Sequence, residues 1–396
     1  MLKKFYIYNR NTCTRVKLYG IDVENLFLEN GYKKTKKVEN SDLVIINTCS
    51  FLKSKEKYFL DLINKINEKL KDNQQLVIIG CLPSINKENL MEINNKMILF
   101  GRDLNKIKEY FNFKNTIKTK ATQVKDKLSF CKNLEYLFNK IFLRSKHIEY
   151  RLKRNKVCYL QISSGCQGRC TYCSERFTTK LKSRPINEIL EAIEDGISRN
   201  YKLFGLNSDD ASAYGKDINS SLEELLKEIV KIKDKIYFSI PEFNPNGLSK
   251  EVLNYLKDEK FLYITVPIQS GSQRILDLMQ RPYKINEVIE KVKHIKENNK
   301  NLKINTHIIV GFPGETNEDF ERTKKVIKTG LFDRVKVFMY NERPNTKAKD
   351  YPNKVPEEIK LERRNELLKI MKIQNIKNFS LTNLILNKEQ LKWLNC

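Results

Sequence analysis

The chain has 396 residues, 40% of them apolar, which is enough for two or three packed domains. No apolar run is long enough to span a bilayer, and the first residues turn polar too soon for a secretory leader, so a cytoplasmic protein without a membrane partner is expected. The formal net charge of +26 favours a polyanionic partner such as nucleic acid, although the abundance of Lys, Asn and Ile also fits a compositional bias. Nine cysteines in such a chain point away from disulfides and towards metal binding, catalysis or core filling.

Residues 1–112 alternate short apolar runs with amphipathic helical patterns. Strands are predicted at 4–8, 42–47, 75–80 and 97–100, and a long helix over 53–71. The continuous apolar character of 42–47 and 75–80 indicates strands that are buried on both faces, as in a parallel sheet. The alternation therefore predicts an N-terminal parallel α/β domain.

Residues 113–150 lack this alternation and are basic, so they are predicted to be a linker with some helix near 134–142. The alternation resumes over 151–345. Strands are predicted at 157–162, 201–206, 235–240, 261–266, 302–310 and 333–338, and helices at 186–199, 220–233, 285–298 and 317–330. Six β-α units predict a full or partial (β/α) barrel, and residues 346–396 a helical C-terminal tail.

A cysteine-rich loop follows the first strand of this barrel. Cys166, Cys170 and Cys173 have CxxxCxxC spacing, and three thiolates this close can hold three irons of one 4Fe-4S cluster. The fourth iron would be free to chelate S-adenosylmethionine (SAM), whose reductive cleavage yields a radical that can attack an unactivated C–H bond. The alternative is a zinc site, but structural zinc usually takes four ligands, and no fourth Cys or His lies close in sequence.

This spacing, with an aromatic residue before the last Cys, resembles the radical SAM superfamily. Three further segments resemble SAM-binding parts of that superfamily, and each ends a predicted strand, where barrel active sites form. They are Leu203–Asn207, Pro267–Ser272 and Gly311–Thr316. The SAM contacts that this resemblance implies are Tyr172, Gly205, Asn207, Gln269, Gly311 and Pro313.

A second set of cysteines follows strands of the N-terminal domain. Cys13, Cys49 and Cys81 each come after a different predicted strand. Because the carboxyl ends of parallel strands lie along one edge of a sheet, the three thiols are expected to converge and to hold a second cluster with one free iron. The alternative is that they fill the core, as buried cysteines often do. The remaining cysteines, Cys131, Cys158 and Cys396, are expected to be structural or exposed thiols.

Taken together, these motifs resemble the radical SAM methylthiotransferases over about residues 1–375. The resemblance includes the two cysteine sets, Asn47–Ser50, Ile79–Cys81, Ser183–Pro185, Ser212–Asp217 and Arg343–Thr346. The segment Asp209–Gly215 is most similar to the branch that modifies threonylcarbamoyl-adenosine beside the tRNA anticodon.

The resemblance implies an enzyme with two 4Fe-4S clusters and SAM that inserts a methylthio group at an unactivated C–H bond of a tRNA adenosine beside the anticodon. The cluster at Cys166, Cys170 and Cys173 would cleave SAM, and the cluster at the other three cysteines would supply sulfur. It also implies a reductant such as flavodoxin or ferredoxin, and no metal other than iron.

Two alternatives stay open at this point. The first is the same chemistry on a protein or peptide side chain, because the family commonly ends in a small β-barrel and the tail after about residue 378 is too short for one. The second is a non-catalytic iron–sulfur RNA-binding protein. The three histidines, His147, His294 and His307, suggest no acid–base centre, and His307 is expected to be a core residue.

Overall fold

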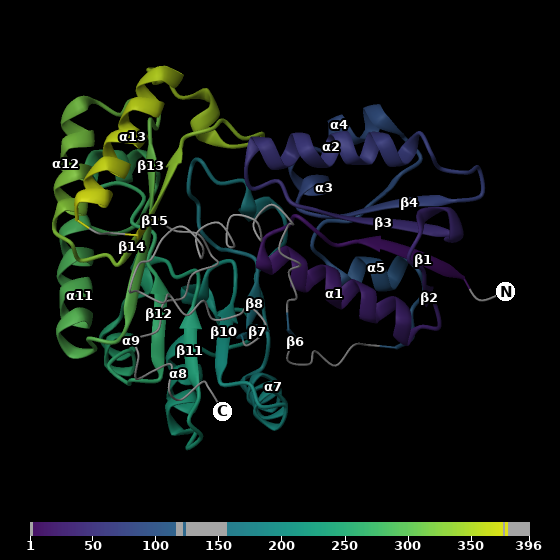
Figure 1. Ribbon diagram of the computed structural model, residues 1–396, viewed down its shortest axis with the longest axis horizontal. Coiled ribbons are helices and arrows are strands. Elements are labelled where there is room, and N and C mark those ends of the chain that lie inside the picture. The colour runs from purple at the N-terminus through teal and green to yellow at the C-terminus, as the bar shows by residue number, and fades with distance from the viewer. Residues whose placement is uncertain (1–2, 116–121, 124–156, 375–376, 379–396) are drawn as a thin grey trace, which may run out of the picture.

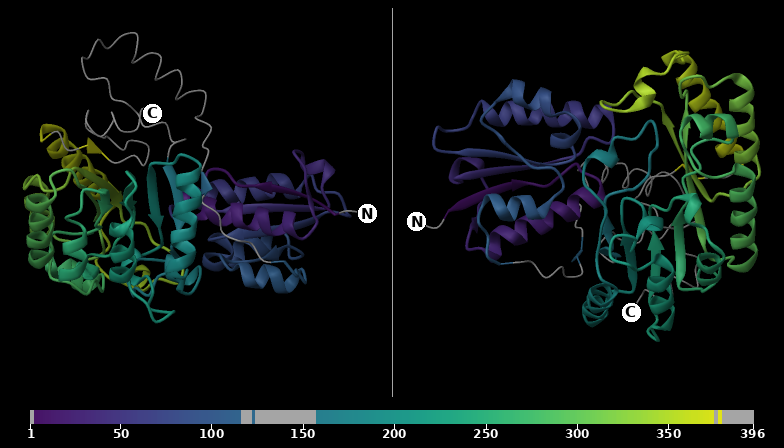
Figure 2. Two further views of the ribbon diagram at one scale, coloured as in Figure 1. Left: turned by 90° about the horizontal axis from the view of Figure 1, so that it is seen from below. Right: turned by 180° about the vertical axis from the view of Figure 1, so that it is seen from behind.

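The computed structural model describes residues 3–115, 122–123, 157–374 and 377–378. Two regions lie side by side, which we call the N-terminal sheet region (3–115) and the barrel region (157–374) (Figures 1 and 2). Most of the predicted linker, including its helix near 134–142, lies outside the described residues, as do Cys131, His147 and Cys396.

The N-terminal sheet region contains a five-stranded parallel sheet in the order β2-β1-β3-β4-β5. Its strands are β1 (Lys4–Tyr8), β2 (Lys33–Lys34), β3 (Leu43–Thr48), β4 (Gln75–Gly80) and β5 (Ile98–Leu99). Helices α1 (Thr14–Glu29) and α5 (Leu104–Tyr110) cover one face; α2 (Lys53–Asn67), α3 (Leu82–Ile85) and α4 (Lys87–Ile93) cover the other (Figure 1). The parallel α/β fold predicted for this region is confirmed.

Burial on both faces explains why β3 is apolar without alternation. All six of its residues are buried. Ile45 packs in the core on the α1 side, and Val44 and Ile46 pack in the core on the α2 side. Strand β2 was not predicted, because its two lysines are exposed and carry no apolar signal.

The barrel region contains six parallel strands that are neighbours in chain order. They are β7 (Val157–Gln161), β10 (Leu203–Asn207), β11 (Tyr237–Ile240), β12 (Phe261–Thr265), β13 (Lys303–Val310) and β14 (Arg334–Met339). The short β6 (Thr122–Gln123) and β15 (Lys377–Asn378) lie at the two edges. Within the described residues β7 and β14 do not pair, so the barrel is a partial one.

Helices cover the outside of this curved sheet (Figures 1 and 2). They are α7 (Ile186–Ser198), α8 (Leu222–Lys231), α9 (Lys250–Tyr255), α10 (Gln273–Leu278), α11 (Ile285–Asn298), α12 (Asn317–Lys328) and α13 (Glu357–Ile373). The four predicted helices are present with ends shifted by at most two residues. Of the predicted helical tail, Glu357–Ile373 is helical, and residues 379–396 lie outside the described residues. The six-residue α9 and α10 were not predicted, because they are too short to show a periodic pattern.

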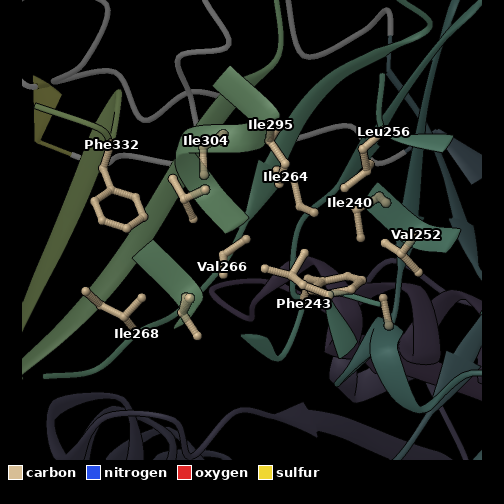
Figure 3. Close-up of a cluster of buried hydrophobic side chains, with 14 of the residues drawn as sticks. Ile240, Phe243, Val252, Leu256, Ile264, Val266, Ile268, Ile295, Ile304 and Phe332 are labelled. Atoms are coloured by element: carbon tan, nitrogen blue, oxygen red, sulfur yellow. The ribbon is translucent and has the colours of Figure 1, made fainter. Parts of the chain in front are cut away.

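The barrel core lies between the strands and these outer helices. Figure 3 shows Ile240 of β11 and Ile264 of β12 packing with Val252 of α9 and Ile295 of α11. On α11 the buried apolar residues recur every three or four positions, which is the spacing of one helix face. The core thus lies behind the strands, and the carboxyl ends of the strands are left to build a site.

None of the helices in the described residues is both long and apolar enough to cross a membrane.

Candidate active site

The CxxxCxxC loop is enclosed by a short antiparallel pair, β8 (Ser163–Ser164) and β9 (Lys182–Ser183). It opens at Gly165, whose φ of +82° belongs to the left-handed region and where a Cβ would lie 2.2 Å from the Lys180 carbonyl oxygen. Only glycine fits there without moving backbone. The loop conformation that presents Cys166 therefore depends on the residue just before it.

Two N–H groups point at the loop sulfurs. The Gly168 amide donates to Cys166 Sγ at 3.2 Å, and Arg281 Nη1 donates to Cys170 Sγ at 3.4 Å. Hydrogen bonds to sulfur stabilise the negative charge of cluster-bound thiolates. The three cysteines and these donors therefore fit a 4Fe-4S cluster.

Burial works against ionisation of the free thiols. It raises the pKa of Cys166 to about 12, with a further contribution from the Asp210 carboxylate, and it raises the pKa of Cys173 as well. A thiol that binds a metal cation is deprotonated in spite of such burial. We therefore expect these buried thiols to be ionised when they bind a metal cation and protonated when they do not.

The three N-terminal cysteines converge as predicted from their positions after parallel strands. Cys49 follows β3, Cys81 follows β4, and Cys13 lies between β1 and α1, immediately before the helix. Cys13 packs against both apolar clusters that contain the other two. A hydrogen bond with the Cys49 thiol and the nearby Arg15 guanidinium lower the pKa of Cys13, although its burial opposes them. The carboxyl ends of these strands face the barrel region (Figure 1).

No group of three His, Cys, Asp or Glu side chains in the described ranges is arranged to hold a single metal ion. The cysteines of a 4Fe-4S cluster bind separate irons, whereas the ligands of one zinc ion surround a single point.

A cavity of about 210 Å³ lies between the two regions. All three loop cysteines line it, and so do Arg15, Phe51 and Leu52 of the N-terminal sheet region, which lie within three residues of Cys13 or Cys49. The structure thus places the loop cysteines on the cavity wall, and sequence neighbours of Cys13 and Cys49 on the same wall, whereas Cys13, Cys49 and Cys81 themselves do not line it.

Two of the six predicted SAM contacts line this cavity: Tyr172 and Gln269. Gln269 has a φ of +64°, which is strained for a residue with a side chain. Its Oε1 is buried and has no hydrogen-bond partner within the described part of the chain. A buried acceptor held on a strained backbone marks a position that suits a ligand.

The other four predicted contacts do not line this cavity. Gly205 packs against the Tyr159 ring, and its carbonyl accepts a hydrogen bond from Asn207 Nδ2 at 3.0 Å. Gly311, with a φ of +71°, packs against the Lys360 side chain and donates to Glu315 Oε2 at 2.6 Å. Pro313 is buried in the same turn. Their role in SAM binding stays a prediction.

Asp209 is the first residue of the Asp209–Gly215 motif, and the structure gives its side chain a specific position. Its buried carboxylate accepts hydrogen bonds from Arg102 Nη1 and Nη2, both at 2.8 Å, from Arg15 Nη1 at 2.9 Å and from the Gly165 amide at 2.6 Å. Burial alone would raise the pKa of Asp209, but the two guanidinium groups hold it well below its usual value. The two arginines are 107 and 194 residues away, so no local pattern predicted the contact.

Glu242 and His307 are among the other titratable side chains that line the cavity. Burial raises the pKa of Glu242 to about 7 in spite of the nearby Arg15 and Lys336. Burial and the Lys336 ammonium lower the pKa of His307 to about 3, so its ring is neutral at pH 7. His307 is buried, as expected of a core residue, but it also faces the cavity.

Comparison with known proteins gives a separate family match for each of the two regions. Residues 160–327 match the radical SAM superfamily, and residues 20–101 match the uncharacterized protein family UPF0004. The chain is 32% identical over 360 residues to the tRNA-2-methylthio-N(6)-dimethylallyladenosine synthase of Fervidobacterium nodosum, covering 89% of this chain and 80% of the relative.

Other similar relatives carry different names. The ribosomal protein uS12 methylthiotransferase RimO of Clostridioides difficile is 30% identical over 91% of this chain and 82% of its own. The probable threonylcarbamoyladenosine tRNA methylthiotransferase of Pyrococcus horikoshii is 30% identical over 87% of this chain and 78% of its own.

The chain therefore belongs to the radical SAM methylthiotransferase family, a family of enzymes, which argues against the non-catalytic alternative. Its fold is similar to that of the radical SAM methyltransferase TsrM from Kitasatospora setae, with a TM-score of 0.64 at 12% identity over 88% of this chain and 75% of that one. Membership of this family implies SAM and a 4Fe-4S cluster.

Proposed function

We propose that this methylthiotransferase works in the cavity between its two regions and uses two 4Fe-4S clusters. Cys166, Cys170 and Cys173 would hold one, and Cys13, Cys49 and Cys81 the other. The observation that carries the proposal is the single cavity lined by the loop cysteines and by neighbours of Cys13 and Cys49.

When bound, the loop cluster and SAM supply a radical able to break a C–H bond, and the second cluster supplies sulfur. The chain's own residues hold and shield these groups. The Gly168 amide and Arg281 donate to the loop sulfurs. Gln269 presents a buried oxygen to the cavity. The aromatic side chains of Tyr172 and Phe338 line its wall and exclude water. A small reductant protein such as flavodoxin or ferredoxin would supply the electron.

Iron analysis tests the two cluster sites. After anaerobic reconstitution the wild-type chain should bind about eight irons, and the triple Ala variant of Cys166, Cys170 and Cys173 about four. The triple Ala variant of Cys13, Cys49 and Cys81 should also bind about four and should still cleave SAM. A matched control is Cys158→Ser, since Cys158 is buried in the barrel core away from the loop. Unchanged iron in either triple variant would reject that site.

The substrate that we propose is a tRNA adenosine beside the anticodon. Two of the relatives above are named for tRNA modification, and the net charge of +26 suits a polyanion. Phe51 at the cavity is 41% exposed, and the Lys336 ammonium lies 6.0 Å from its ring centre. Proteins that read single-stranded RNA stack unpaired bases on exposed aromatic rings of this kind.

Mass spectrometry of tRNA nucleosides, from cells with and without this gene, tests the substrate. Loss of a methylthio-adenosine species in the deletion strain, restored by the wild-type gene but not by the Cys166→Ala variant, is the expected result. An unchanged nucleoside profile would reject the tRNA substrate.

A protein side chain is the second candidate, because several relatives are named for ribosomal protein uS12 at 27–31% identity. An unchanged nucleoside profile, together with a 46-Da mass loss in a ribosomal protein of the deletion strain, would favour it.

A further inference from the structure

Two groups of buried ion pairs join the N-terminal sheet region to the barrel region beside the cavity. In the first, which we call the Asp209 clamp, Asp209 of the barrel region binds Arg15 and Arg102 of the N-terminal sheet region. The side chains of Asp209 and Arg102 are each 2% exposed. Arg102 also lies 3.5 Å from Glu175, two residues beyond Cys173.

The Asp209 clamp reaches both cysteine sets. On one side, its carboxylate accepts the amide N–H of Gly165, the residue before Cys166. On the other, it binds Arg15, which lies two residues after Cys13 in the first turn of α1. One carboxylate thus fixes the start of the CxxxCxxC loop and the helix start that carries Cys13.

The second group, the Arg343 clamp, reaches the same edge from another strand. Arg343 follows β14, and its Nη2 donates to the Ser50 carbonyl at 2.5 Å, to Ser50 Oγ at 2.6 Å and to Glu56 Oε2 at 2.7 Å. Ser50 is the residue after Cys49. Asn86 Nδ2 donates to Glu56 Oε1 at 2.6 Å and completes the partners of that carboxylate.

Ion pairs of this kind set geometry more than they add stability. The desolvation of buried charges offsets much of their attraction, and well-packed apolar residues often stabilise as much. The two-point contact between Arg102 and Asp209, however, satisfies one relative orientation only. An apolar interface would tolerate sliding between the two regions, whereas the clamps do not.

We propose that Asp209 is a positioning residue that couples the two cysteine sets. By tying Gly165 to Arg15 and Arg102, it holds the sets at one separation and orientation, so that a substrate activated at one is within reach of the other. The inference rests on the two-cluster function proposed above.

The test compares Asp209→Asn with the wild-type enzyme, using total tRNA from the deletion strain as substrate. Asn keeps the size of Asp and an oxygen that can accept the Gly165 N–H, but it loses the charge that binds both arginines. Iron should stay near the wild-type content, and SAM cleavage should stay within about twofold. Methylthio product per SAM cleaved should fall at least tenfold. Asp195→Asn is the control, since Asp195 forms an exposed pair with Arg199 on α7 and should change nothing.

A second readout does not depend on the substrate. The EPR spectrum of the fully reduced protein should show magnetic coupling between the two clusters, and this coupling should weaken in Asp209→Asn but not in Asp195→Asn. Arg102→Lys keeps the cation, loses the two-point contact, and should show a smaller loss in both readouts. If Asp209→Asn does not fold, Arg102→Lys alone carries the test.

The outcomes separate the inference from the proposed function. A wild-type product ratio and EPR coupling in a variant with full iron would overturn the inference. A parallel loss of SAM cleavage and product would show a merely structural role and would also overturn it. Wild-type protein with only about four irons, or with no methylthio product from tRNA, would instead count against the proposed function.

Discussion

Gly165 and Gly31 have nearly the same left-handed backbone, with φ of +82° and +83°, but different surroundings. A Cβ on Gly165 would meet the Lys180 backbone at 2.2 Å, while nothing lies within 4 Å of one on Gly31. The pair therefore separates the cost of the backbone conformation from the cost of the steric clash.

We expect Gly31→Ala to lower the free energy of unfolding by about 1–2 kcal/mol, because Ala is strained in the left-handed conformation. Gly165→Ala should lose more and should also disturb the loop at Cys166, so that iron content falls from about eight to about four. Thermal unfolding and iron analysis of both variants check this. Equal stability of the two variants with full iron in each would contradict the assigned loop strain.

The carboxylate of Asp319 allows the electrostatic stabilisation by a single residue to be measured. Burial alone would raise its pKa, but hydrogen bonds from Arg274, Ser272 and Thr316 outweigh it and lower the pKa to about 2. Because the pKa in the folded state is depressed, the stabilisation is complete above the usual carboxyl pKa and is lost only as the pH falls from about 4 towards 2.

Asp319→Asn should therefore lower the free energy of unfolding by the same amount at pH 7 and at pH 5.5. The expected loss is about 1 kcal/mol after allowance for solvent screening, or roughly 2 °C in Tm. Calorimetry at the two pH values measures it. A loss that fades at pH 5.5 would mean that the carboxylate titrates well above 2.

At the scale of elements, α13 supports the turn that precedes α12. Arg363 of α13 donates to the Glu315 carboxylate at 2.7 Å and to the Glu315 carbonyl at 3.2 Å, and Asn317 accepts from it at 3.0 Å. The turn ends in a capping box between Thr316 and Asp319, which fixes where α12 begins. The C-terminal end of the Gly311–Thr316 segment is thus held in place.

If Gly311 and Pro313 contact SAM as predicted, Arg363→Gln should weaken SAM binding about tenfold, since a turn that has lost a buried charged hydrogen bond must be reordered on binding at a cost of about 1.5 kcal/mol. Arg364→Gln is the matched control, because Arg364 is only half-buried and is the next residue along the helix. Titration calorimetry of the iron-loaded protein measures both. Equal SAM affinity in the two variants would show that α13 does not support SAM binding.

At the scale of the whole molecule, the excess of 74 basic over 48 acidic residues bears on the substrate. An RNA that binds through its phosphates releases counterions, so its affinity falls steeply with salt. A peptide substrate held in the cavity has no comparable dependence.

We expect the affinity for total tRNA from the deletion strain to fall about twentyfold between 50 and 200 mM KCl if three phosphates are contacted, and further with more contacts. Fluorescence anisotropy with end-labelled tRNA measures the slope. A flat dependence would argue against RNA and for the protein substrate.

Local residue patterns were enough to predict most helices and strands and the position of the cysteine loop. A strand that is buried on both faces, such as β3, shows as a continuous apolar run, and a helix such as α11 shows as apolar residues three or four positions apart. Both patterns involve neighbouring residues, so they can be recognised in the sequence. The CxxxCxxC loop is equally local. The convergence of Cys13, Cys49 and Cys81 was also predictable, because strand ends in a parallel sheet share an edge.

How the two regions meet could be learned only from the folded structure. The cavity combines residues as distant as Arg15 and Arg343, and the partners of Asp209 lie 107 and 194 residues away. Such contacts depend on how the two sheets are placed relative to each other. The periodic pattern of apolar residues within each sheet carries no information about that placement. The pairing of a buried Asp with two buried Arg became visible only when that placement brought them together.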